Sequence, residues 1–150
     1  MKDQSHISKL WWVIPQKLSG MPQPKREDLA PLYNAGVRAI VSLLEDSAGV
    51  DEYQENNFMS LWVPVADNGV PSDDQLEQLV NFIDSNLDAN LPVAIHCKGG
   101  KGRTGTMLAA YMICKGATYD EAMEKINNAL PNAVKKEFQI KFLQELSVSM

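Results

Sequence analysis

The chain has little cysteine: two thiols, Cys97 and Cys114, stand among 150 residues. Two cysteines do not make the disulfide framework of a small secreted protein, so we expect a reduced, cytoplasmic protein. The polar first residues are followed only by a brief apolar run, 10–14, which is too short for the core of a signal peptide. The longest later apolar stretch, 107–114, falls far below the ~20 residues of a membrane span. We therefore expect no integral membrane association.

Basic residues are also scarce, and the net charge of −5 argues against general nucleic-acid binding. Residues 1–90 carry six Lys and Arg against 14 Asp and Glu, whereas residues 91–150 carry eight against five. The positive charge thus gathers around and after a glycine-rich segment, which indicates a local anion site in an acidic protein. No repeat, low-complexity segment or cluster of metal ligands is evident. We expect one monomeric domain over 1–150, with a flexible N-terminus at 1–9, no metal and no cofactor.

Hydrophobic patterning predicts strands early in the chain and mostly helices late. Aromatic and β-branched runs predict strands, and apolar spacing of three and four predicts helices. This order favours a compact α/β domain, with a short, mixed and mainly parallel sheet flanked by helices. The strands are expected over 11–14, 37–44, 59–65 and 92–96; the helices over 26–35, 72–90, 104–115, 119–130 and 135–146; and a turn and a loop over 18–24 and 45–55.

One segment organises the rest of the chain, and we call it the glycine loop (residues 97–103). An apolar strand ends at His96, Cys97 opens the loop, and Arg103 and Thr104 begin an apolar helix. Backbone N–H groups in such a loop converge on one point and bind an anion there, helped by the positive end of the helix. The residues expected to bind a phosphate are Lys98, Gly99, Gly100, Lys101, Gly102 and Arg103.

Two other glycine-rich motifs fit less well. Gly100-x-Gly102-x-x-Gly105 matches the dinucleotide fingerprint, whose acidic partner should end a second strand ~20 residues on. Here residues 120–121 begin a helix instead, and only 45 residues follow Gly105. A Walker-type loop needs a glycine where Cys97 stands.

The pattern Cys-x5-Arg-Thr gives each residue type a chemical task. Converging N–H groups, the helix N-terminus and Arg103 lower the pKa of Cys97 and favour its nucleophilic thiolate. Arg103 presents two donors to two phosphate oxygens. Thr104 is expected to hydrogen-bond the Cys97 sulfur and to help it leave in a second step. His96 is expected to orient the cysteine backbone rather than to act as a base.

The signature His96-Cys97-x5-Arg103-Thr104-Gly105 resembles that of the cysteine-dependent protein tyrosine phosphatase superfamily. The short length and late loop resemble its compact atypical dual-specificity branch, over residues 11–146. The low-molecular-weight phosphatases carry their loop near the N-terminus and do not fit. The resemblance implies a dual-specificity phosphatase-like fold and hydrolysis of phosphate esters through a cysteinyl-phosphate.

Enzymes of this superfamily need a general acid on a mobile loop, typically an Asp some thirty residues before the cysteine. Asp67 stands 30 residues before Cys97, after a predicted strand and in a Gly/Pro loop. The resemblance implies that Asp67 protonates the leaving oxygen and then deprotonates the attacking water. The family often has proline directly before this Asp, whereas here Ala66 intervenes and the proline is Pro64.

The segment 131–139 resembles the water-positioning segment of the family, with Gln139 at the matching position. It departs from the family pattern at Lys135 and Lys136, where acidic or hydroxyl residues are usual.

The second cysteine, Cys114, is expected in the core. It follows Thr104 by ten helical residues, or ~15 Å along the axis. A disulfide needs Cα atoms within ~7 Å, so we expect no bridge between Cys114 and Cys97.

The substrate class stays open at this point. We expect first a phosphoprotein phosphatase acting on phosphotyrosine and on phosphoserine or phosphothreonine. The alternative is a phosphoinositide or inositol polyphosphate phosphatase, because Lys98 and Lys101 resemble the loop lysines of the tumour-suppressor-type phosphoinositide phosphatases. A minor alternative is a phosphate-binding module with little turnover.

Overall fold

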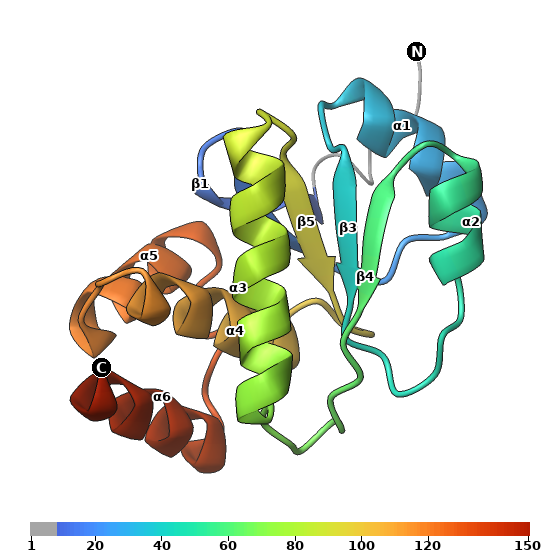
Figure 1. Ribbon diagram of the computed structural model, residues 1–150. Coiled ribbons are helices and arrows are strands. Elements are labelled where there is room, and N and C mark those ends of the chain that lie inside the picture. The colour runs from blue at the N-terminus through green and yellow to red at the C-terminus, as the bar shows by residue number, and fades with distance from the viewer. Residues whose placement is uncertain (1–8) are drawn as a thin grey trace.

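The computed structural model describes residues 9–150 and places one five-stranded sheet between two layers of helices (Figure 1). This arrangement confirms the predicted α/β class with a mixed, mainly parallel sheet. The segment 1–9 expected to be flexible lies outside the described residues, apart from Lys9. The strands are β1 (Trp11–Ile14), β2 (Leu18–Met21), β3 (Ala39–Ser42), β4 (Met59–Trp62) and β5 (Val93–His96). The helices are α1 (Leu29–Asn34), α2 (Val50–Glu55), α3 (Asp73–Asp88), α4 (Gly102–Cys114), α5 (Tyr119–Ala129) and α6 (Glu137–Ser149), with a 3-10 turn at Arg26–Asp28.

The strand order is β1-β2-β5-β3-β4, so the last strand in the chain lies at the centre of the sheet. β1 is antiparallel to β2, while β2, β5, β3 and β4 run parallel. Met21 and Ser42 both pair with His96, and Trp62 pairs with Ser42. The carboxyl ends of four strands therefore meet at one edge, where α/β sheets bind their ligands.

The two faces of the sheet bury separate cores. α1 and α2 cover one face, and α3 to α6 lie on the other (Figure 1). Side chains of β5 alternate between the faces: Val93 and Ile95 pack toward the larger core, and Ala94 packs toward the smaller one. All four residues of β5 are fully buried, which explains its unbroken apolar run before His96.

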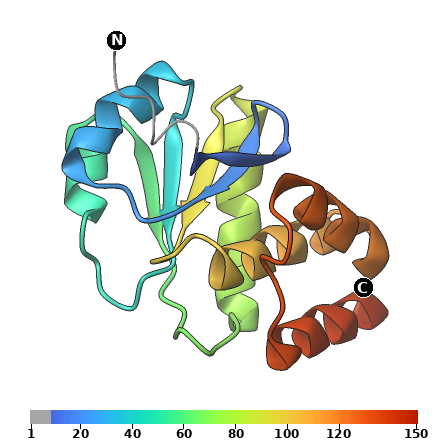
Figure 2. The ribbon, with the colours of Figure 1, turned by 180° about the vertical axis from the view of Figure 1, so that it is seen from behind.

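The prediction of a turn over 18–24 was wrong for its first four residues, because Leu18–Met21 forms the fully buried strand β2. Gly20, which reads as a turn residue, lies against the indole of Trp11: a Cβ on Gly20 would come within 2.3 Å of that ring. The close cross-strand packing of an aromatic ring therefore requires glycine inside this strand. The β1–β2 hairpin lies at the edge of the sheet beside α5 (Figure 2).

The prediction of an irregular loop over 45–55 was also wrong in part. Residues Val50–Glu55 form α2, whose Tyr53 is 2% exposed and packs in the smaller core. A six-residue helix is too short to be stable alone, so tertiary packing rather than local periodicity supports it. Within residues 9–150, no helix is both long and apolar enough to cross a membrane.

Candidate active site

The glycine loop joins β5 to α4 and is fixed by the strands beside it. Gly100 has a φ of +73°, and a Cβ there would lie 2.4 Å from the carbonyl of Met21, so glycine alone fits. The indole Nε1 of Trp11 donates to the Gly100 carbonyl at 3.0 Å. The backbone N–H of Gln23 donates to the Lys98 carbonyl at 3.1 Å. Contacts from β1 and from the end of β2 thus hold the loop in its tight conformation.

Cys97 is the first residue of this loop, and it is buried, with 3% of its surface exposed. Burial by itself raises the pKa of the thiol. The Thr104 hydroxyl, the backbone N–H groups of Thr104 and Gly100, and the charge of Arg103 act in the opposite direction and hold the pKa of Cys97 below its usual value. The hydroxyl of Thr104 donates to the sulfur at 3.2 Å. A lowered pKa enlarges the thiolate fraction near neutral pH, and the thiolate is the nucleophilic form.

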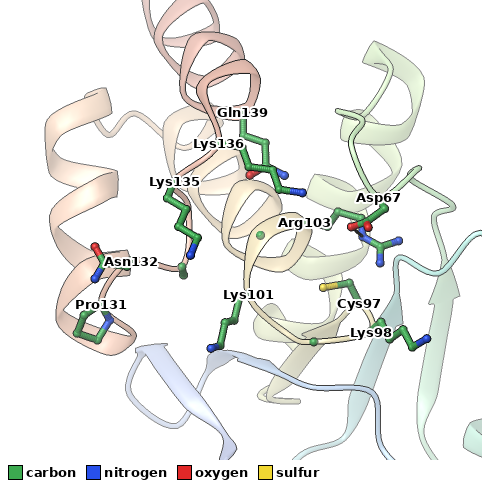
Figure 3. Close-up of a pocket in the computed structure, with 13 residues that line it drawn as sticks. Asp67, Cys97, Lys98, Lys101, Arg103, Pro131, Asn132, Lys135, Lys136 and Gln139 are labelled. Carbon is green, nitrogen blue, oxygen red and sulfur yellow. Dashed lines mark ion pairs between the residues drawn. The ribbon is translucent and has the colours of Figure 1, made fainter.

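The side chains of Arg103 and Asp67 approach each other in the pocket that contains Cys97 (Figure 3). The Arg103 side chain is 8% exposed, and its Nη1 donates to the Val65 carbonyl at 3.0 Å. Its Nε lies 3.7 Å from Oδ1 of Asp67, whose side chain is 74% exposed. The backbone before Asp67 thus orients the guanidinium, while the carboxylate stays accessible to a substrate.

His96 lies behind the loop, fully buried between two polar groups. Its Nδ1 is 3.1 Å from the Cys97 carbonyl, and its Nε2 is 2.8 Å from the Tyr53 hydroxyl. A carbonyl only accepts, so Nδ1 carries the proton, and in the neutral ring Nε2 accepts from Tyr53. Burial raises the pKa of Tyr53 and keeps it neutral. Sequence reasoning missed Tyr53, because folding alone brings α2 to a histidine 43 residues further along the chain.

Gln139, in the first turn of α6, lines the same pocket although it is only 1% exposed. Neither its Oε1 nor its Nε2 has a hydrogen-bond partner among the described residues. A Cβ on Gly102 would lie 3.5 Å from this amide, which places Gln139 against the start of α4. Buried amide groups normally have partners, so this one is suited to a ligand or water in the pocket.

The pocket measures about 650 Å³ and carries more positive than negative charge. Its charged lining residues are one acid, Asp67, together with Arg103 and four lysines. The loop lysines extend to opposite sides of the glycine loop, whereas Lys135 and Lys136 approach from the segment before α6 (Figure 3). Gly99 and Gly102 also line this pocket, whereas Gly100 faces a neighbouring one. The four lysines are Lys98, Lys101, Lys135 and Lys136.

Among residues 9–150, no group of three or more His, Cys, Asp or Glu side chains is arranged to hold a metal ion. Cys97 and Cys114 are both free thiols. Cys114 is half-buried at the last position of α4 rather than inside the core, and it packs against the core from the edge.

Comparison with known proteins places this arrangement in one family. The family described as "Polymorphic toxin system, DSP-PTPase phosphatase" matches residues 15–117, more than half of the chain. The chain therefore belongs to this family of dual-specificity and tyrosine phosphatase domains. The resemblance drawn from the His-Cys-x5-Arg-Thr-Gly signature is confirmed.

Two solved structures share the fold. Tk-PTP in its active form has a TM-score of 0.86 and 26% identity, covering 95% of this chain and 98% of that one. PTPMT1 in complex with PI(5)P has a TM-score of 0.80 and 23% identity, covering 91% of this chain and 93% of that one.

Curated relatives align over part of their own length. The phosphatidylglycerophosphate phosphatase PTPMT2 of Arabidopsis thaliana is 29% identical over 143 residues, or 91% of this chain and 63% of the relative. MJECL20 of Methanocaldococcus jannaschii, an uncharacterized protein, is 32% identical over 57% of this chain and 58% of the relative. The chain therefore spans less than two thirds of these relatives.

Proposed function

We propose that the chain hydrolyses phosphate monoesters in two steps through a phosphorylated Cys97. One observation carries this proposal: a buried thiol of lowered pKa, an arginine and an accessible carboxylate share one pocket. In the first step the Cys97 thiolate attacks phosphorus, the S–P bond forms and the P–O bond to the leaving group breaks. Asp67, which enters this step as the carboxylic acid, gives its proton to the departing oxygen and becomes a carboxylate.

The glycine loop and Arg103 act on the phosphoryl group during this transfer. Backbone N–H groups at the start of α4 and the guanidinium fork bind its non-bridging oxygens, where negative charge is held in the transition state. The 3.0 Å bond from Arg103 to the Val65 carbonyl uses one of its five donors and leaves others for the substrate. His96 fixes the Cys97 backbone from behind and takes no proton.

In the second step a water molecule attacks phosphorus and the P–S bond breaks. Asp67, now a carboxylate, accepts a proton from that water. The unpartnered amide of Gln139 orients the water, because it has a donor and an acceptor buried at the pocket wall. The Thr104 hydroxyl stabilises the departing thiolate through its bond to the sulfur.

The charge of the pocket favours a substrate with anionic groups beside the phosphate that is removed. The pocket is lined by one acid, Arg103 and four lysines. This positive charge exceeds what a single phosphotyrosine needs for binding. A phosphoinositide or an inositol polyphosphate fits this charge, and PTPMT2 is named for a lipid phosphomonoester. This proposal reverses the preference drawn from the sequence, because Lys135 and Lys136 line the same pocket as Lys98 and Lys101.

A phosphoprotein is the second candidate, and the direction of the loop lysines favours it. Lys98 and Lys101 extend away from the Cys97 sulfur to either side of the loop (Figure 3). In that position they need not contact the substrate, and a singly phosphorylated side chain would suffice. Tk-PTP, at 26% identity, carries a protein tyrosine phosphatase name.

Initial rates of phosphate release separate these candidates. The substrates are a phosphotyrosine peptide, a phosphothreonine peptide, soluble phosphoinositides and inositol polyphosphates, with Cys97→Ser as the blank. We expect inositol phosphates to give the highest kcat/KM, and Lys135→Ala and the Lys98→Ala/Lys101→Ala double variant to remove that lead. A lead by phosphopeptides that survives these changes would favour the phosphoprotein instead. Vanadate binding without turnover of any aryl phosphate would leave only a phosphate-binding module.

A further inference from the structure

The loop between β4 and α3, residues 63–72, carries Asp67, and we call it the acid loop. A turn closes its tip, where the Gly69 N–H donates to the Ala66 carbonyl at 2.8 Å. Asp67 and Asn68 are the two central residues of this turn. The direction of the Asp67 carboxylate therefore depends on how the tip of the turn is held.

Contacts from two helices, α3 and α4, and from the residue before α6 hold the acid loop. In α3, the Gln75 side chain donates to the Pro64 carbonyl at 2.7 Å. In α4, Arg103 donates to the Val65 carbonyl at 3.0 Å. Both contacts lie before the turn.

The third contact reaches the turn itself. The ammonium group of Lys136, at the start of α6, donates to Oδ1 of Asn68 at 2.7 Å, across 68 residues of sequence. Lys136, before α6, and Arg103, in α4, thus contact adjacent residues of the tip, Asn68 and Asp67.

We propose that Lys136 is a positioning residue whose hydrogen bond to Asn68 holds the acid loop over Cys97, so that Asp67 faces the leaving oxygen. This inference rests on the proposed role of Asp67 as general acid. It gives Lys136 a task different from that of Lys135, whose side chain extends into another part of the pocket (Figure 3).

The backbone of Lys136 is well fixed for this task. Its carbonyl accepts from the N–H groups of Gln139 and Ile140, both at 3.1 Å, in the first turn of α6. The same turn carries the Gln139 amide into the pocket. The contact therefore links the acid of the first step to the residue proposed to orient water in the second.

The experiment compares two substrates that differ in their need for an acid. Phenyl phosphate has a poor leaving group, whereas the leaving group of p-nitrophenyl phosphate departs with little protonation. For Asn68→Ala and for Lys136→Met, we expect kcat/KM to fall about 2- to 10-fold with phenyl phosphate, the range of one hydrogen bond. With p-nitrophenyl phosphate we expect little change for Asn68→Ala, and for Lys136→Met only the loss that Lys135→Met also shows, because both lysine variants remove one positive charge from the pocket. The ratio of the phenyl phosphate rate to the p-nitrophenyl phosphate rate should fall no further in the double variant than in either single variant, because both remove the same contact.

Matched controls separate position from charge. Lys136→Arg keeps a cationic donor and should retain the phenyl phosphate rate that Lys136→Met loses. Lys135→Met removes an equal charge from the pocket and should affect both substrates by the same factor. Lys141→Met removes a charge from the exposed side of α6 and should change neither rate. Thermal unfolding of each variant checks that the fold is retained.

Two results would overturn the inference, and they differ in what else they remove. If Lys136→Met slows both substrates equally, as Lys135→Met does, or if the effects of Asn68→Ala and Lys136→Met on the phenyl phosphate rate add, Lys136 does not act through Asn68 and the proposed function stands. Asp67→Ala serves as the reference and should slow phenyl phosphate far more than p-nitrophenyl phosphate. If it slows both equally, Asp67 is not the acid, and this step of the proposed function fails together with the inference.

Discussion

The two cysteines of the chain lie near opposite ends of α4, and the pKa values of their thiols are shifted in opposite directions. Cys97 lies under the N-terminal end, and Cys114 is the last residue of the helix. Burial by itself acts to raise the pKa of both thiols. At Cys97 the hydrogen bonds from Thr104 and Gly100 and the charge of Arg103 outweigh burial, so its pKa falls. At Cys114 burial acts alone, and its pKa rises.

The difference shows that burial does not decide whether a thiol reacts. Cys97 is the more buried of the two, yet its pKa is the lower one. What distinguishes it is the set of donors at the beginning of a helix, where N–H groups lack partners within the helix. The end of a helix presents carbonyl groups instead and offers a thiolate no such donors.

The largest contrast is expected in turnover. Cys97→Ser should reduce kcat on the order of 10⁴- to 10⁶-fold, as the loss of a catalytic nucleophile does. Cys114→Ser should leave kcat within about twofold, because the residue is remote from the pocket and only partly buried. Phosphate release from p-nitrophenyl phosphate measures both. Comparable losses in the two variants would break the comparison.

The glycines at the two ends of α4 predict a second contrast, in stability. Gly100 and Gly116 both have a positive φ, +73° and +107°. An added Cβ meets the Met21 backbone at Gly100 and open space at Gly116. We expect Gly116→Ala to lower the free energy of unfolding by about 1 to 2 kcal/mol. Gly100→Ala should lower it by about 2 to 5 kcal/mol, because backbone strain and a backbone clash combine. Chemical denaturation measures both, and equal losses would mean that the loop does not pack as described.

Alkylation by iodoacetate tests the pKa contrast directly. Only the thiolate reacts, so a lowered pKa brings the rate to its plateau at lower pH, and a raised pKa delays the rise. The Cys97 rate should therefore level off below the pH expected of a free cysteine, while the Cys114 rate keeps rising above it. Peptide mapping after labelling separates the two sites. Parallel profiles would contradict the assignment.

The smallest predicted effect tests how much the Thr104 hydroxyl contributes to the lowered pKa of Cys97. Thr104→Ala removes the hydroxyl that donates to the Cys97 sulfur at 3.2 Å. The thiolate loses a donor, so the pKa of Cys97 should rise and its alkylation profile should move to higher pH. The profile of Cys114 should not move and serves as the internal control. An unchanged Cys97 profile would assign the shift to the backbone N–H groups and Arg103 alone.

The glycine loop and its flanking elements were predictable from sequence because their signals are local. An apolar run before His96, glycines after Cys97 and an apolar helix after Arg103 lie within one continuous stretch. β2 and α2 were not predictable in this way. Gly20 gives a turn signal until the Trp11 indole is packed on it, and α2 depends on the burial of Tyr53.

In the candidate site, too, the residues with a local sequence signal were predictable and the long-range contacts were not. The structure brings Asp67, Arg103 and Gln139 to the pocket around Cys97, positions that the sequence pattern had singled out. The contacts that support them were beyond sequence reasoning. Tyr53 reaches His96 across 43 residues and Lys136 reaches Asn68 across 68, and neither spacing carries a signal before the chain folds.

The most direct test of the account is to find where the phosphoryl group resides during turnover. The full chain is mixed with p-nitrophenyl phosphate, quenched in acid within the first turnover, digested and analysed by mass spectrometry. The account predicts a phosphoryl group on the peptide that contains Cys97, none on the peptide that contains Cys114, and none on Cys97→Ser. Phosphate release at an undiminished rate from Cys97→Ser, or a phosphoryl group on Cys114, would contradict it.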